Sequence, residues 1–198
     1  MSVAIAIVIA VVVILAVAGA VVTYNRLVRK RNRTDEAWSQ IDVELKRRHD
    51  LVPNLVHTVA GYAAHERGTF EAVTAARSAA VEAGARADPA AVSAAENALG
   101  RTLRSLFAVA ENYPQLRAEE GFLALQEQLT TTEDKLEYAR RYYNTSVRDY
   151  DSAIQSFPAL LIAGPFGFKP RAFFDADTAD RQPPTVEFPA GGPRAPAG

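Results

Sequence analysis

Histidine and acidic residues are the side chains in this sequence that could hold a metal ion or move protons. His49, His57 and His65 are eight residues apart, so on an unbroken helix each is rotated by about 80° from the one before, and the three cannot converge on one ion. None of them has a glutamate three residues earlier, the spacing that di-metal four-helix proteins use. We therefore predict no metal site and no bound cofactor.

Familiar catalytic motifs do not fit the sequence either. His65-Glu66 begins like the helix of a zinc protease, but the second histidine would have to stand at position 69, which is a threonine. The sequence has no phosphate-binding glycine loop, no Gly-x-Ser-x-Gly turn and no dinucleotide-binding glycine cluster. Glu111 and Glu133 could do acid–base work if a cleft surrounded them. We nominate no catalytic residue, and a hydrolase with an unrecognised site is the least favoured alternative.

Arg48 stands where a helix should present an apolar side chain to its core. Because a buried cation is costly unless it is paired and hydrogen-bonded, we predict a structural polar network in which Arg48 meets Glu111 or Glu133, with Arg140 as a second cation for these carboxylates. Such a network would fix the register of the helices. The alternatives are that Arg48 extends to the surface or binds a ligand.

The elements that must position these residues are helices. Apolar side chains recur three and four residues apart after Trp38, as Ile41, Leu45, Val52, Leu55, Val59 and Tyr62. Pro53 lacks a backbone donor and follows a possible N-cap at Asp50, so we expect a kink or a restart near 50–53.

Two further helices follow from capping signals and periodicity. Asp88-Pro89 predicts a helix start and Asn112-Tyr113-Pro114 its end. A regular stripe from Phe122 to Phe157 predicts a last helix about 54 Å long. With no convincing strand pattern, the predicted fold is all-α: an antiparallel four-helix-type bundle of long helices over residues 35–176.

The N-terminal residues predict a membrane anchor. Residues 3–22 are apolar throughout and long enough to cross a bilayer, so we assign 1–23 to a single transmembrane helix, with a cleaved signal peptide as the alternative. Residues 24–34 form a basic segment that predicts a cytoplasmic bundle and an N-terminus outside the cell. Its cations are candidates for contact with the membrane surface, although a topology signal alone would explain them: Arg26, Arg29, Lys30, Arg31 and Arg33.

Composition restricts the possible partners. The formal net charge is −1, which gives no general attraction to nucleic acid, and the absence of cysteine removes disulfides and thiolate sites. From residue 177 to 198 the chain is rich in proline, glycine and alanine, so we expect a disordered tail. The expected partners are the lipid bilayer and a membrane-associated protein.

Adjacent tyrosines suggest where a protein partner would bind. Tyr142 and Tyr143 point about 100° apart on a helix and cannot both face the core. One of them should be exposed, and with Asn144 it forms a candidate interaction surface. Trp38, in contrast, has the spacing of a core residue with Ile41 and Leu45.

Several ordered motifs resemble those of the LemA family. They are Tyr24-Asn25, Trp38, the run from Arg47 to Val56, Gly61-Tyr62, His65-Glu66, the run from Glu111 to Pro114, the run from Arg140 to Asn144, and Phe157-Pro158. The resemblance covers roughly Tyr24 to Phe174. It implies an N-terminally anchored bacterial membrane protein with a four-helix-type cytoplasmic bundle and no established enzymatic activity.

These observations favour a membrane-anchored helical scaffold that recruits or organises proteins at the cytoplasmic face, and not an enzyme. An accessory subunit for membrane proteolysis or the envelope stress response is the alternative. Crosslinking in membranes would discriminate between protein recruitment and membrane remodelling.

Overall fold

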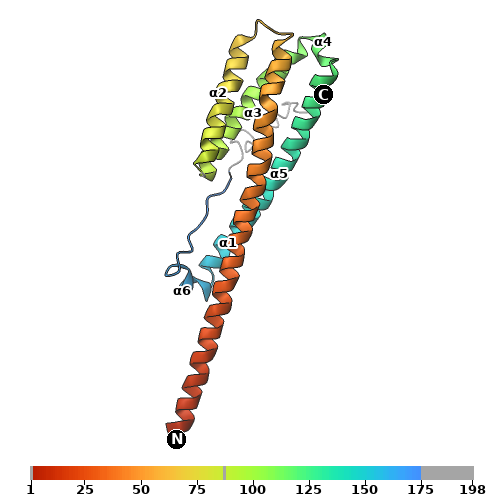
Figure 1. Cartoon of the computed structure of the whole chain (residues 1–198). Helices are drawn as coiled ribbons and strands as arrows, with labels where there is room; N and C mark the ends of the chain where they lie inside the picture. The colour runs from red at the N-terminus through yellow and green to blue at the C-terminus, as the bar shows by residue number, and fades with distance from the viewer. Residues whose placement is uncertain (1, 87, 175–198) are drawn as a thin grey trace, which may run out of the picture.

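The computed structural model describes residues 2–86 and 88–174, and all regular secondary structure in this part of the chain is helical. Four long helices lie antiparallel in a bundle that stands at one end of a long stalk (Figure 1). The predicted all-α fold is therefore confirmed. The predicted disordered tail, 177–198, lies outside the described residues.

The first helix, α1 (Ser2–Ala60), forms both the stalk and one side of the bundle. At 1.5 Å per residue its 59 residues extend about 88 Å. Among the helices of the described residues, α1 alone is long and apolar enough to cross a membrane, by the part of it near the N-terminus. The predicted restart near 50–53 is wrong, because α1 continues through Pro53; the carbonyl that this proline leaves free has a partner on α2, described below.

The other helices begin and end at recognisable signals. After α2 (Arg67–Ala85), α3 (Pro89–Glu111) starts as predicted, with the Asp88 carboxylate accepting a hydrogen bond from the Ala90 N–H at 3.1 Å. Pro114 ends α3 and begins the single turn α4 (Pro114–Arg117). The predicted last helix is α5 (Glu120–Gln155), which returns along α1 towards the stalk.

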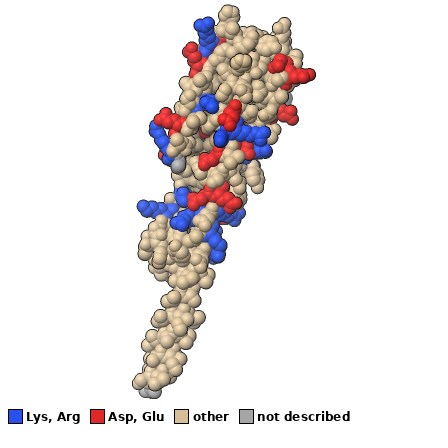
Figure 2. Space-filling model, viewed as in Figure 1, with Lys and Arg blue, Asp and Glu red and all other residues tan. Residues whose placement is uncertain are grey.

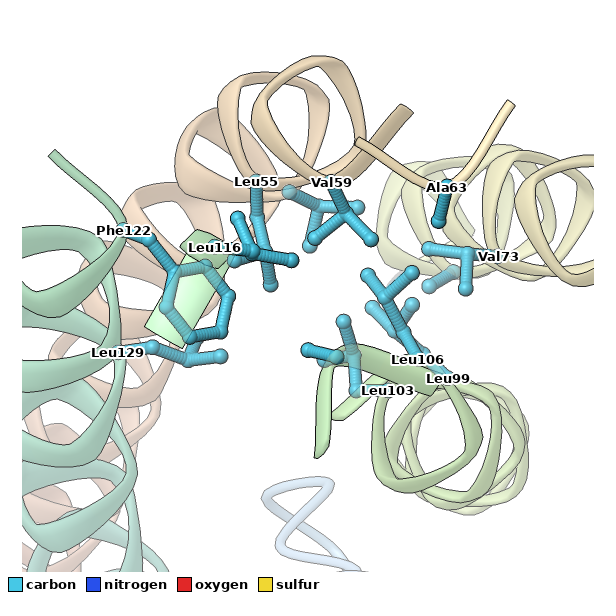
Figure 3. Packing of buried hydrophobic residues seen from close by; sticks show 13 residues of the cluster. Leu55, Val59, Ala63, Val73, Leu99, Leu103, Leu106, Leu116, Phe122 and Leu129 are labelled. Carbon is cyan, nitrogen blue, oxygen red and sulfur yellow. The ribbon is translucent and has the colours of Figure 1, made fainter. Parts of the chain in front are cut away.

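Apolar side chains fill the bundle in three successive clusters. The distal core lies at the end farthest from the stalk and contains side chains from each of the helices from α1 through α5 (Figure 3). Its largest members are Leu55, Val59, Leu99, Leu103, Leu106, Leu116, Phe122 and Leu129. The middle core contains Ala37, Ile41, Leu45, Val92, Leu136, Ala139, Tyr143, Val147 and Phe174. The stalk-proximal core contains Leu27, Tyr150, Ile154, Ala159, Ala163 and Phe168.

The chain after α5 folds back onto the bundle. The short helix α6 (Ala159–Ala163) packs beside α1 at the base of the bundle. Gly167 adopts φ 71°, a left-handed conformation that suits glycine, and the chain then turns back along the bundle. Residues 168–174 end at Phe174, which is buried in the middle core.

Candidate functional site

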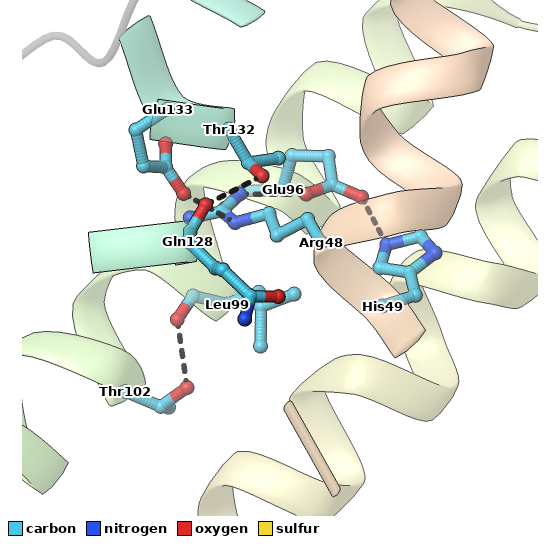
Figure 4. A network of polar contacts seen from close by, with 8 residues as sticks. All are labelled: Arg48, His49, Glu96, Leu99, Thr102, Gln128, Thr132 and Glu133. Carbon is cyan, nitrogen blue, oxygen red and sulfur yellow. Dashed lines mark hydrogen bonds and ion pairs between the residues drawn. The ribbon is translucent and has the colours of Figure 1, made fainter. Parts of the chain in front are cut away.

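A buried layer of charge crosses the bundle between its distal and middle cores. Arg48 on α1 is 4% exposed, and its Nη1 lies 2.7 Å from Oε2 of Glu96 on α3 (Figure 4). Its Nε lies 2.7 Å from Oε1 of Glu133 on α5; the orientation of these two atoms makes the contact an ion pair without a well-directed hydrogen bond. One guanidinium thus connects three helices.

Glu96 is the most deeply buried charge of this layer, at 1% exposed. Its second carboxylate oxygen, Oε1, lies 2.6 Å from Nε2 of His49. Burial alone would raise the pKa of the Glu96 carboxyl, but the hydrogen bond from His49 and the charge of Arg48 outweigh burial and hold that pKa below its usual value. Glu96 is therefore an ionised carboxylate that accepts hydrogen bonds from two consecutive residues of α1.

The fourth helix joins the layer through the backbone of α1. In a regular helix the carbonyl of His49 would accept a hydrogen bond from the residue four positions later, but that residue is Pro53 and has no N–H. Arg77 on α2 supplies the missing donor, its Nε lying 2.7 Å from the His49 carbonyl oxygen. A proline inside α1 thus creates an acceptor that holds α2 against α1.

The predicted network is present in part. Arg48 meets Glu133, one of its two expected partners, whereas Glu111 is exposed at the end of α3, beside a pocket that Arg117 also lines. Glu111 lies outside the layer because it is fifteen residues from Glu96, about 22 Å along α3. Arg140 lies nearby with its Cζ 4.6 Å from the centre of the Phe174 ring, a cation–π contact. Burial and the positive charge of Arg48 lower the pKa of Arg140.

Sequence reasoning missed Glu96 and His49, although one signal pointed to Glu96. The apolar stripe of α3 has buried residues at Val92, Leu99 and Leu103, and position 96 continues the same three-four spacing. A carboxylate in that stripe matches Arg48 in the stripe of α1. No corresponding signal identified His49.

The predicted interaction surface at residues 142–144 is largely covered by the chain itself. Tyr143 is buried, packs edge-on against Trp38 and donates from its hydroxyl to the Ala172 carbonyl at 2.8 Å. Burial raises the pKa of Tyr143 to about 12, so it remains a neutral donor. Asn144 binds both the N–H and the carbonyl of Phe174, each at 2.9 Å. The expectation of a free docking face is corrected, because residues 172–174 occupy it.

The five basic residues beside the apolar segment differ in their contacts. Arg33 donates from Nε to the hydroxyl of Tyr142 at 3.0 Å, and its Cζ lies 5.4 Å from the centre of that ring. Arg31 stacks on Phe168 at 5.4 Å. Arg26 and Arg29 are exposed and Lys30 is half-buried. Figure 2 shows lysine and arginine side chains gathered between the apolar stalk and the bundle, and these five residues follow the apolar run directly in the sequence.

A surface groove of about 690 Å³ lies between α1 and α5 on the bundle. Two exposed apolar side chains line it, Val43 (65% exposed) and Tyr138 (70% exposed). Three carboxylates and one lysine surround them, at Glu36, Glu44, Asp134 and Lys135. The Oε2 atom of Glu44 is buried and has no hydrogen-bond partner. The groove therefore combines exposed apolar side chains with a net negative rim. The predicted surface at Tyr142–Asn144 does not offer this combination.

Within residues 2–86 and 88–174, no group of three or more histidine, cysteine, aspartate or glutamate side chains has a geometry that could hold a metal ion. In the buried layer the carboxylate of Glu96 is engaged by two cationic or donor side chains. This arrangement can hold helices together.

A sequence model of the LemA family matches residues 37–188, which is most of the chain. The chain belongs to the LemA family. The match begins in the middle of α1 and includes the whole charged layer and every residue that lines the groove except Glu36. The resemblance seen in the sequence motifs is thereby confirmed.

Relatives of this LemA-family chain include two kinds of protein. It is 26% identical over 184 residues to magnetosome protein MamQ 2 of Paramagnetospirillum magneticum, covering 81% of this chain and 67% of that protein. Magnetosome protein MamQ of Magnetospirillum gryphiswaldense matches with the same identity and coverage. Protein LemA of Metamycoplasma hominis is 25% identical over 158 residues, covering 79% of this chain and 71% of the relative.

Proposed function

We propose that this LemA-family protein is a membrane-anchored scaffold that holds a protein partner against its bundle at the cytoplasmic face of the membrane. The observation that carries the proposal is the unbroken course of α1 from the apolar segment into the bundle core. Because no linker separates the anchor from the bundle, the groove is held at a fixed height above the bilayer.

The charged layer supports a rigid scaffold. Its contacts connect α1 to α2, α3 and α5 within a few residues of one another, at His49, Arg48 and their partners. Buried polar contacts of this kind favour one register between helices, since a slip along any helix would leave charges unpaired. A bundle with a single register presents its surface groove in one shape.

The groove between α1 and α5 indicates the chemistry of the partner. Val43 and Tyr138 offer apolar contact, and the acidic rim favours a partner with basic side chains. A short helix with one apolar face and flanking lysine or arginine residues fits this surface. Two relatives are named as magnetosome proteins, which is compatible with a role in organising membrane-bound components.

Photo-crosslinking in native membranes tests this proposal. A photoreactive amino acid replaces Tyr138 in the groove or, as a control, Val81 of α2, which is also exposed and does not line this groove. We expect a protein adduct of defined mass from position 138 and none from position 81. In the same background, Glu44→Lys should abolish the adduct because it reverses the charge of the rim. Adducts with lipid alone, or a protein adduct that Glu44→Lys leaves unchanged, would contradict the proposal.

Orientation is tested separately. The chain has no cysteine, so single-cysteine variants report one position each. With intact cells, a membrane-impermeant maleimide should label Ser2→Cys directly and Glu71→Cys only after lysis, since Glu71 lies on the bundle. Labelling of Glu71→Cys without lysis would place the bundle outside and rule out a cytoplasmic partner.

A further inference from the structure

Large apolar side chains are exposed on and around α6. They are Phe157 (81% exposed), Leu160 (59%), Leu161 (67%) and Phe166 (62%). These residues fall within ten positions of one another and flank or belong to one five-residue helix. A concentrated apolar surface of this kind marks a place that another apolar phase covers.

The position of α6 identifies that phase. Ile162 and Phe166 line a wholly apolar pocket together with Ala20, Val21 and Tyr24 of α1. The Phe166 ring meets the Tyr24 ring edge-on with their centres 5.2 Å apart. The segment from Phe157 to Phe168 is therefore packed against the last turn of the apolar run that would cross the membrane.

The depth of this contact follows from helix geometry. Residues 3–22 extend about 30 Å, which is the thickness of the hydrocarbon layer, so Val22 marks its edge. Ala20 and Val21 lie inside that edge by about 3 Å or less, and Tyr24 lies just outside it. Side chains that contact these residues are at the boundary between headgroups and acyl chains, where apolar faces of interfacial helices lie.

The surface changes from uncharged to basic at the same height along α1. The uncharged surface of the stalk continues over the bulge at the base of the bundle, and the band of lysine and arginine begins directly above it (Figure 2). Arg26 and Arg29 on α1 are exposed at this level, and Lys169 follows the α6 segment along the chain. Cations here meet anionic headgroups while the apolar side chains below them meet lipid.

The backbone of the segment is prepared for a nonpolar environment. The N–H groups of Leu161, Phe166, Gly167 and Phe168 all donate to carbonyls within the segment, at 2.9–3.2 Å. An unpaired N–H would be costly to remove from water, and these four carry no such cost.

We propose that residues 157–168 form a second membrane contact, an apolar wedge that inserts into the headgroup and acyl-chain boundary of the bilayer beside the span of α1. The wedge gives the bundle a second point of attachment to the bilayer. This inference goes beyond the scaffold function and does not depend on a partner in the groove.

Depth-dependent fluorescence quenching in the full chain tests the wedge. Trp38 is the only tryptophan, so Trp38→Phe provides a background in which Leu161→Trp reports one exposed position. The variant is reconstituted in phosphatidylethanolamine–phosphatidylglycerol vesicles that contain lipids brominated either near the headgroup or near the middle of the bilayer. We expect blue-shifted emission that the shallow bromines quench more than the deep ones. Leu160→Trp serves as a second reporter, should Leu161→Trp not fold.

Two control positions make the outcomes decisive. Val12→Trp in the middle of the apolar run should be quenched more by the deep bromines, and Val81→Trp on α2 should not be quenched. Water-like, unquenched emission from both α6 reporters, with Val12→Trp quenched, would overturn the wedge and leave the span intact. Quenching of Val81→Trp would overturn it too, because the bundle itself would then lie on the lipid. Failure of the scaffold proposal would show in the crosslinking experiment and not here.

Discussion

Arginine side chains lie at two heights along α1, at Arg26–Arg33 beside the apolar segment and at Arg48 inside the bundle. The first group is exposed or stacked on the rings of Phe168 and Tyr142, and its charges remain close to water. Arg48 is enclosed and depends on two carboxylates from other helices. The comparison teaches that burial, and not residue type, decides whether a cation of α1 depends on buried carboxylates or remains close to water.

The largest effect should follow from removing the charge of Glu96. Glu96→Gln leaves Arg48 buried with one remaining anionic partner, so we expect the free energy of unfolding of the bundle to fall by about 3–5 kcal/mol. Urea denaturation followed by circular dichroism in detergent measures it. Glu82→Gln, which removes an exposed glutamate paired with Arg86, is the matched control and should change stability by less than about 0.5 kcal/mol. Equal losses would contradict the distinction between the buried and the exposed ion pair.

Removing both charges should cost less than the two single losses together. Arg48→Met leaves Glu96 buried with only His49, whereas Arg48→Met combined with Glu96→Gln removes both charges of this pair and leaves unpaired only Glu133, whose side chain is 38% exposed. A double-mutant cycle should therefore show a clear positive coupling between the two positions. Additive losses would mean that Arg48 and Glu96 are stabilised independently.

Acid should weaken the same layer. The pKa of Glu96 is lowered in the folded protein from its usual value of 4.5, so the folded state holds this carboxylate ionised more strongly than the unfolded state does. The stabilising contribution is complete above pH 4.5 and is lost as the pH falls through the folded pKa. Denaturation midpoints measured from pH 7 downwards should decline in this window. In Glu96→Gln the decline should be shallower, and an unchanged slope would contradict the assignment.

A smaller effect is expected at the proline of α1. Arg77→Met removes the donor to the His49 carbonyl and leaves that carbonyl without a partner, a loss of about 1–3 kcal/mol. In a Pro53→Ala background the alanine N–H can bond to the same carbonyl, so Arg77→Met should cost less there. Urea denaturation of the four proteins measures the difference. The interpretation fails if Arg77→Met costs the same in both backgrounds.

The smallest effects should occur in the basic segment. Arg31→Gln removes a cation–π contact with Phe168 and should lower the stability of the bundle by about 0.5–1 kcal/mol. Arg26→Gln, at an exposed position, should change it by less than about 0.5 kcal/mol. Thermal denaturation of the two variants in one detergent gives the comparison, and a larger loss for Arg26→Gln would reverse it.

Local signals in the sequence predicted most of the fold. The apolar spacing located the bundle part of α1 together with α3 and α5, although not the alanine-rich α2. Asp88-Pro89 and Pro114 gave boundaries that the structure confirms, and the apolar run identified the candidate span. Pro53 was misread because the rule for proline is also local. The rule accounts for the hydrogen bond that proline cannot donate. It does not reveal that a side chain on another helix supplies a replacement donor.

The site was less predictable for the same reason. Placing Arg48 in an apolar stripe requires only the period of α1, and so the sequence already indicated a buried cation in need of a carboxylate. To predict that Arg48 pairs with Glu96 and not with Glu111, one must know the axial position at which α3 packs against α1. That position depends on the packing of all four helices.

The sequence by itself thus determined α1, α3 and α5 with their buried stripes, and the apolar segment beside a basic one, because each depends on neighbours within a few turns. Only the tertiary structure decided that Tyr143 turns inward to bind Ala172, that Arg77 completes the backbone at Pro53, and that α6 lies beside the span. These contacts join residues far apart in the chain, and their formation depends on the axial register and rotation of packed helices, which no local spacing encodes.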